Sequence, residues 1–125
     1  MAGSDSPTPP AVTEARLDRG AGRLHLTFED GARYSYSAEF LRVLSPSAEV
    51  QGHGPGPAVT VPGKRGVGIT ALEAVGNYAL RILFDDGHDT GIYSWAYFRE
   101  LGEEQAVKWS RYLEALDREG LSRDP

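Results

Sequence analysis

The stretch YALRILFDDGHDTGIYSWAYFREL, residues 78–101, decides the fold of this 125-residue chain. Its first part, Tyr78–Phe84, is rich in aromatic and branched side chains and predicts a β-strand. Asp85–Gly87 is typical of a tight hairpin turn, because glycine accepts a positive φ angle without steric cost. The chain returns through Gly91–Tyr93, and Ser94 predicts the N-cap of a short helix that ends at Gly102. The stretch therefore predicts a strand, a turn, a second strand and a helix in succession.

Other segments predict further hairpins of the same kind. Polar and apolar residues alternate between residues 23 and 28, so Leu24, Leu26 and Phe28 share one face of a strand. His25 points away from that face and is expected to be half exposed. Because short turns join antiparallel strands, we expect an antiparallel sheet built from hairpins, with strands at Thr13–Asp18, Arg23–Phe28, Arg33–Tyr36, Ile69–Val75 and Tyr78–Phe84.

Two more helices and a long loop complete the expected domain. Ser37 is a suitable N-cap for a helix over residues 38–44, and Pro46 stops that helix soon afterwards. A final helix is predicted from Glu103 to Gly120, with these side chains at helical spacing: Ala106, Trp109, Tyr112, Leu113 and Leu116. The loop at residues 51–68 is long for a connection, so we expect it to be functional or mobile, with a brief strand at 59–61.

These elements predict one small α+β domain over residues 12–120, with an antiparallel hairpin-built sheet, two short helices and a C-terminal helix. Residues 1–11 are expected to form a disordered tail, and residues 121–125 a frayed one. The composition, 40% apolar and 25% charged, is that of a soluble globular protein. Cysteine is absent, which suits a reducing cytoplasm. A net charge of −5 argues against nucleic acid as a partner, and no apolar run is long enough to predict a membrane span.

Possible site chemistry is concentrated at one bend. Asp86, His88 and Asp89 offer two carboxylates and an imidazole to a metal, but a single histidine without cysteine makes a poor zinc site. An iron site of the two-histidine type would need His25 or His53 as well. Ser94, His88 and Asp86 form a hydrolytic triad only on paper, and no catalytic motif accompanies them. The alternative is that the aspartates shape the turn and His88 hydrogen-bonds a neighbouring strand.

A second candidate lies in the long loop. Gly63–Gly66, with Lys64 and Arg65 between two glycines, could bind an anion through backbone N–H groups and two cations. The phosphate-binding pattern G-x-x-x-x-G-K-[ST] is not met there, because Arg65 follows the lysine.

Four stretches resemble a known family: FLR at 40–42, SPSAE at 45–49, VGNYA at 75–79 and DGHDTGIYSW at 86–95. They are similar to small bacterial proteins that resemble the N-terminal domain of gamma-butyrobetaine hydroxylase, over residues 15–101. The resemblance implies no hydroxylase activity, because the iron and 2-oxoglutarate sites of those enzymes lie in a separate catalytic domain. The same domain also occurs fused to P-loop ATPases that carry iron–sulfur clusters, which implies an accessory or docking role.

The resemblance also implies a position for a zinc site. In the two-domain hydroxylases a structural zinc is held by three cysteines and a histidine, and these positions correspond to Ser45, Ser47, Val50 and His88 here. Serine hydroxyls ligate zinc poorly and valine does not ligate it. The departure from the family pattern therefore places that zinc site in doubt.

We accordingly expect a non-catalytic binding or accessory module with a protein partner. Its predicted binding residues are Arg42, Asp86, His88, Asp89, Tyr93 and Trp95, with Tyr93 and Trp95 as an aromatic wall and Arg42 as a carboxylate contact. The alternative is a metal-binding protein linked to iron–sulfur cluster assembly or oxygenase function, with iron or zinc on His88.

Overall fold

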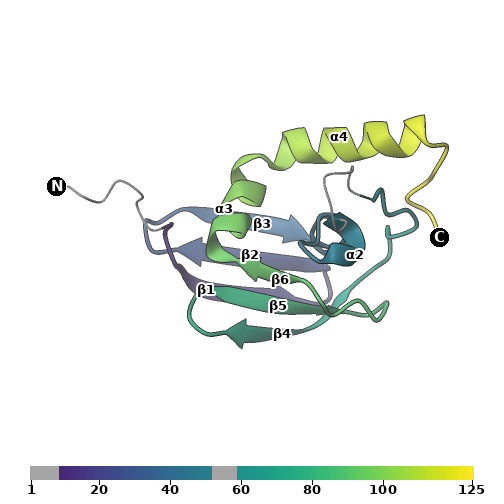
Figure 1. The fold of residues 1–125 in the computed structure, drawn as a ribbon. Coiled ribbons are helices and arrows are strands. Elements are labelled where there is room, and N and C mark those ends of the chain that lie inside the picture. Colours follow the sequence, from purple (N-terminus) through teal and green to yellow (C-terminus); the bar gives the residue numbers. More distant parts are fainter. Residues whose placement is uncertain (1–8, 52–58) are drawn as a thin grey trace.

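The computed structural model describes residues 9–51 and 59–125, and it contains two three-stranded antiparallel sheets (Figure 1). The first sheet has the order β1-β2-β3, and the second has the order β4-β5-β6. The strand bounds are Val12–Asp18 for β1, Arg23–Phe28 for β2, Arg33–Ser37 for β3, Ile69–Val75 for β4, Ala79–Phe84 for β5 and Ile92–Ser94 for β6. The α+β class is confirmed.

Both sheets contribute one face to the main hydrophobic core, and a second, smaller cluster is formed by Val43, Tyr112 and Leu116. Leu24, Leu26 and Phe28 alternate along β2 and are at most 1% exposed, as the sequence pattern predicts. Leu80 and the two following alternate residues of β5 belong to the same buried cluster. The two amphipathic sheets therefore bury their apolar faces together.

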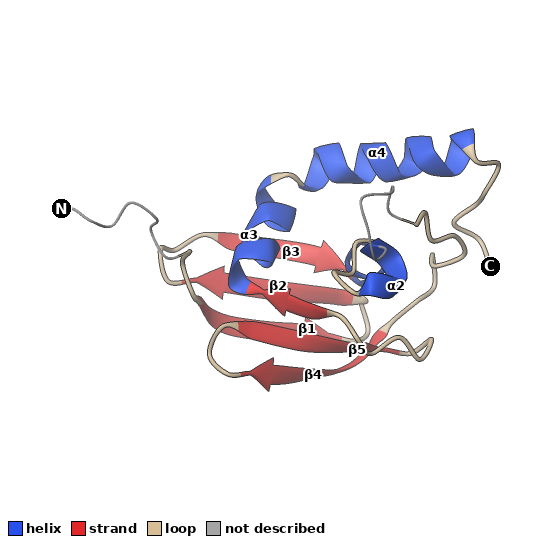
Figure 2. Ribbon diagram, viewed as in Figure 1, coloured by secondary structure: helices blue, strands red, loops and turns tan. Residues whose placement is uncertain are grey.

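In the part of the chain that the structure describes, four helices accompany the sheets: α1 Ala38–Val43, α2 Ala48–Gln51, α3 Trp95–Glu103 and α4 Gln105–Arg118. Figure 2 shows α4 outside the sheets, with α3 joining it to β6. The two predicted caps are confirmed, since Ser37 Oγ accepts from the Phe40 N–H at 3.0 Å and Ser94 Oγ accepts from the Tyr97 N–H at 3.1 Å. Helix α2 is short and was not predicted.

The expected end of α3 at Gly102 is wrong, because this helix continues to Glu103 and Gly102 lies inside it. A Cβ atom placed on Gly102 would lie 2.5 Å from Cγ of the Tyr34 ring. The glycine therefore lets an aromatic ring of β3 approach the helix backbone, and it is not a stop signal.

Two further expectations need correction. The brief strand at 59–61 is absent, although the Val59 N–H donates to the Val50 carbonyl at 2.7 Å. On α4 the buried side chains are Tyr112 and Leu116, whereas Leu113 is 39% exposed, so the apolar face is narrower than predicted. The tail at residues 1–11 lies mostly outside the described residues.

The C-terminal residues, expected to fray, are held to the loop before β4. The N–H groups of Gly63 and Arg65 donate to the carbonyls of Ser122 and Arg123 at 2.9 and 3.0 Å. The Arg123 side chain also reaches Glu39 of α1 with two hydrogen bonds of 2.7 and 2.8 Å. Backbone pairing and an ion pair together order this segment.

Candidate functional site

The predicted hairpin turn between β5 and β6 is present. Gly87 has a φ angle of 89°, which L side chains rarely adopt. The Phe84 N–H donates to the His88 carbonyl at 3.0 Å, and the His88 N–H donates to Oδ1 of Asp86 at 3.1 Å. Asp86 and Gly87 thus shape the turn and fix the direction of the His88 side chain.

His88 is 5% exposed, and both of its ring nitrogens have partners. Nδ1 lies 3.0 Å from Oε1 of Glu49, and Nε2 lies 2.9 Å from Oγ of Ser45. An ionised carboxylate only accepts, so we assign the ring proton to Nδ1 and let the Ser45 hydroxyl donate to Nε2. His88 therefore joins the turn to the segment that carries α2.

The order Ser45, His88, Glu49 matches the hydroxyl, imidazole and carboxylate of a hydrolytic triad. However, Ser45 is completely buried, and its Oγ also accepts the Ser47 N–H at 3.2 Å. A nucleophile must be reached by its substrate, and this hydroxyl is not. The arrangement is therefore a structural hydrogen-bond network. The triad of Ser94, His88 and Asp86 considered from the sequence is not formed either, because the Ser94 hydroxyl caps α3.

Asp86, in the β5–β6 turn, forms ion pairs with two cations. Its Oδ2 lies 2.8 Å from Nε of Arg42 and 2.6 Å from Nζ of Lys64. Burial opposes ionisation of this carboxyl, but the hydrogen bonds from Lys64 and Arg42 outweigh burial and lower its pKa to about 2. The predicted carboxylate contact of Arg42 thus lies within the protein. Lys64 of the Gly63–Gly66 segment is likewise used by the protein's own Asp86.

The positions implied for a zinc site are brought into one buried region but do not suit the metal. Ser45, Ser47, Val50 and His88 are each at most 7% exposed. Two neutral hydroxyls and an alkyl group replace three thiolates, and the fourth donor is already bonded to Ser45. Ser47 Oγ pairs with Oγ1 of Thr90 at 2.7 Å. Hydrogen bonds hold this region together in place of metal–ligand bonds.

Within residues 9–51 and 59–125, no three histidine, aspartate or glutamate side chains are grouped so as to hold a metal ion. His25, considered as a second iron ligand, is a residue of β2 in the other sheet, and His53 lies outside the described residues. The same part of the chain contains no helix that is long and apolar enough to cross a membrane.

The two residues of the predicted aromatic wall, Tyr93 and Trp95, do not form one surface beside His88. Tyr93 is completely buried, its hydroxyl donates to the Leu41 carbonyl, and burial raises the pKa of this hydroxyl. Trp95 lies at the opposite end of the β5–β6 pair, where its indole N–H donates to the Asn77 carbonyl at 2.7 Å. Tyr93 therefore belongs to the core, and Trp95 is not near His88 along the hairpin. Asp89 remains exposed beside Arg81, with its Oδ2 3.8 Å from Nη1.

Three contributors to the site were not predicted from the residues as partners of His88 or Asp86, namely Ser45, Glu49 and Lys64. Each lies 22–43 residues from its partner in the chain, and a single sequence carries no pattern at such separations. The available signal was the resemblance, which placed Ser45 and His88 in one site.

The chain is similar to several solved structures. Two NMR solution structures are 44% and 43% identical, with TM-scores of 0.81 and 0.82; they match 100% and 94% of this chain and 91% and 93% of their own chains. A crystal structure of a protein of unknown function from Acidithiobacillus ferrooxidans ATCC 23270, of the DUF971 family, is 32% identical with a TM-score of 0.62 and covers 74% of this chain and 92% of its own.

Among curated proteins no match is found. The profile described as gamma-butyrobetaine hydroxylase-like, N-terminal, matches residues 15–99. These residues contain most of β1, all of the other strands, α1, α2 and the β5–β6 turn with His88. The chain therefore belongs to the gamma-butyrobetaine hydroxylase-like N-terminal family.

Proposed function

We propose that this protein is a non-catalytic accessory module that binds a partner protein through the β5–β6 turn. The observation that carries the proposal is that the reactive groups of the turn are bonded within the protein. His88 is held by Ser45 and Glu49, and Asp86 is held by Arg42 and Lys64. Groups held in this way give a rigid surface, whereas a reaction centre needs groups that a substrate can reach.

The outward side of the turn supplies the contacts for a partner. The side chains of Glu49 and Asp89 are 61% and 53% exposed, so both carry solvent-facing carboxylate oxygens. Because His88 anchors Glu49 from below, that carboxylate is held in place before a partner arrives, which lowers the entropic cost of association. The family's description as an N-terminal region also supports a role beside another domain or protein.

The proposal is tested by purification with an affinity tag from a native lysate, followed by reciprocal tagging of each recovered protein. We expect Asp89→Arg to abolish recovery of the specific partner, because it reverses an exposed charge of the turn. Asp117→Arg on α4 is the matched control, since it makes the same charge change at another exposed position. Equal recovery with both variants would remove the turn from the binding surface.

An esterase assay tests the claim that the module is non-catalytic. The wild-type protein is incubated with p-nitrophenyl acetate, and its rate is compared with that of Ser45→Ala. We expect the two rates to agree, because Ser45 is completely buried. Turnover that disappears in Ser45→Ala would show a working triad and contradict a non-catalytic role.

A further inference from the structure

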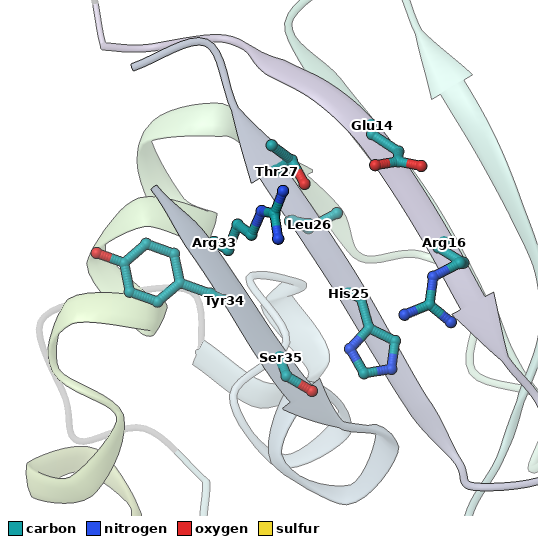
Figure 3. Close-up of a pocket in the computed structure, with 8 residues that line it drawn as sticks. All are labelled: Glu14, Arg16, His25, Leu26, Thr27, Arg33, Tyr34 and Ser35. Atoms are coloured by element: carbon teal, nitrogen blue, oxygen red, sulfur yellow. The ribbon is translucent and has the colours of Figure 1, made fainter. Parts of the chain in front are cut away.

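The outward face of β1, β2 and β3 carries a group of polar side chains that no described element covers. Adjacent strands pair Arg16 with His25 and His25 with Ser35 in one row, and Glu14 with Thr27 and Thr27 with Arg33 in the next. Successive residues of a strand point to opposite faces, and the alternate residues of β2 are buried in the core. These two rows therefore point away from the core (Figure 3). We call them the arginine face.

The arginine face is hollowed. A cavity of about 360 Å³ lies over it. Its lining residues are Glu14, Arg16, His25, Leu26, Thr27, Arg33, Tyr34 and Ser35. Figure 3 shows Arg16 and Arg33 on different strands, with His25 and Thr27 on the strand between them. Because all of these strands belong to one hydrogen-bonded sheet, the backbone fixes the positions from which these side chains extend.

Arg16 and Arg33 are the two arginines that line this cavity, and neither forms an ion pair within the described residues. Seven of the 13 lysines and arginines do form ion pairs elsewhere on the described chain: Arg42, Lys64, Arg65, Arg81, Arg99, Lys108 and Arg123. Arg19, Arg111 and Arg118 also lack an ion pair among the described residues, but they do not line this cavity. Arg23, on β2, donates to Oγ of Ser35 at 2.9 Å and to no carboxylate. Glu14 is the single carboxylate among the residues that line the cavity.

We propose that the arginine face binds an acidic, extended segment of a partner protein, with side-chain carboxylates on Arg16 and Arg33. Guanidinium groups hold carboxylates through two parallel hydrogen bonds, and Thr27, on the strand between the two arginines, provides a hydroxyl donor. This surface is separate from the β5–β6 turn, so the inference does not depend on the function proposed above.

The spacing of the two arginines suits such a segment. Strands lie about 4.8 Å apart and residues on one face of a strand repeat about every 6.7 Å, so the Cα atoms of Arg16 and Arg33 are roughly 12 Å apart. Acidic residues at positions i and i+4 of an extended segment are about 13 Å apart. A nucleic acid is disfavoured, because Arg16 and Arg33 are the only lysines or arginines among the described residues that line the cavity, whereas nucleic-acid binding needs a cluster of such cations facing successive phosphates.

The experiment measures binding of a fluorescein-labelled peptide of alternating glutamate and threonine by fluorescence anisotropy, and maps the site by amide NMR shifts of the 15N-labelled protein. We expect saturable binding that weakens as salt is added, with shifts concentrated on β1, β2 and β3. Arg16→Glu/Arg33→Glu is expected to lower the affinity at least tenfold.

The matched control is Arg111→Glu/Arg118→Glu on α4, which changes the net charge equally at two exposed arginines. An equal loss of peptide affinity in this control would show that binding depends only on the net charge of the protein, and it would overturn the proposal. Shifts that map elsewhere, an absence of saturation, or tighter binding of a 20-base-pair DNA duplex at the same salt concentration would also overturn it. If the charge-reversed protein fails to fold, Arg16→Gln/Arg33→Gln removes both cations without adding like charges, and the same tenfold loss is required.

Discussion

Arg123 is bound to Glu39 through two hydrogen bonds, although 84 residues separate them in the chain. The side chain of Glu39 is 7% exposed, so its carboxylate depends on this partner. The guanidinium carbon of Arg123 also lies 5.1 Å from the centre of the Trp109 ring. The arginine thus links α1, α4 and the C-terminal segment.

Arg123→Ala should lower the free energy of unfolding by about 2–4 kcal/mol, because it leaves a buried carboxylate without its partner. Urea unfolding monitored by circular dichroism measures the change. Arg65→Ala is the control, since the side chains of its ion pair with Asp124 are 51% and 64% exposed, and it should cost less than about 1 kcal/mol. Similar losses in both variants would show that the buried ion pair contributes no more than an exposed one.

Gly91→Ala should destabilise the protein by about 1–3 kcal/mol, because a Cβ atom there would overpack the buried region around Ser45. That atom would lie 2.5 Å from Oγ of Ser45 and 3.1 Å from Cε1 of Tyr93. The control is Gly66→Ala, where a Cβ atom meets nothing within 4 Å. Thermal unfolding compares the two variants, and a stable Gly91→Ala protein would mean that Ser45 can move away from His88.

Asp86 should make stability depend on acidic pH. Its pKa is lowered from 3.8 to about 2 in the folded protein, so its contribution is complete above pH 4 and is lost as the pH falls through 2. Partial solvent screening limits this contribution to about 1–2 kcal/mol. Unfolding measured from pH 6 to pH 2 should therefore show a shallower acid loss for Asp86→Asn. Asp89→Asn, at an exposed position, should follow the wild type; if it also flattens the profile, the effect is one of net charge.

Removal of metal should leave the protein unchanged. The melting temperature and the circular dichroism spectrum are expected to be the same before and after dialysis against a chelator, because Ser45, Ser47 and Val50 supply no thiolates. Added zinc should raise the melting temperature only in a Ser45→Cys/Ser47→Cys/Val50→Cys variant, since a ligand stabilises the state that binds it. Loss of structure in the chelated wild-type protein would establish a site that the described donors do not explain.

Local patterns were sufficient for most of the fold. Alternation along β2, the Asp-Asp-Gly turn and the serine caps each act over a few residues, and each is present as predicted. Gly102 was misread because glycine both ends helices and permits close approach, and only the position of Tyr34 decides between these roles. The division into two sheets and the docked C-terminal segment depend on contacts between distant residues, which no local pattern records.

The site was predicted in part for the same reason. Asp86 and His88 lie in one turn, so their proximity follows from the sequence alone. Tyr93 and Trp95 are close to them in the chain, but β6 carries them toward the other end of the hairpin and places Tyr93 in the core. Neighbours in sequence become neighbours in space within a turn, whereas a strand separates them by about 3.3 Å per residue.

The link between Glu39 and Arg123 also sets an order of events during synthesis. At about 5–20 residues per second, a ribosome adds the arginine roughly 4–17 s after the glutamate. The hairpins of β1, β2 and β3 use only residues made before or with Glu39, so they can form in that interval. The carboxylate meanwhile has no cation at hand, and burying α1 in the core stays unfavourable. Helix α1, most of whose residues are buried, is therefore expected to be among the last parts of a nascent chain to reach its final position.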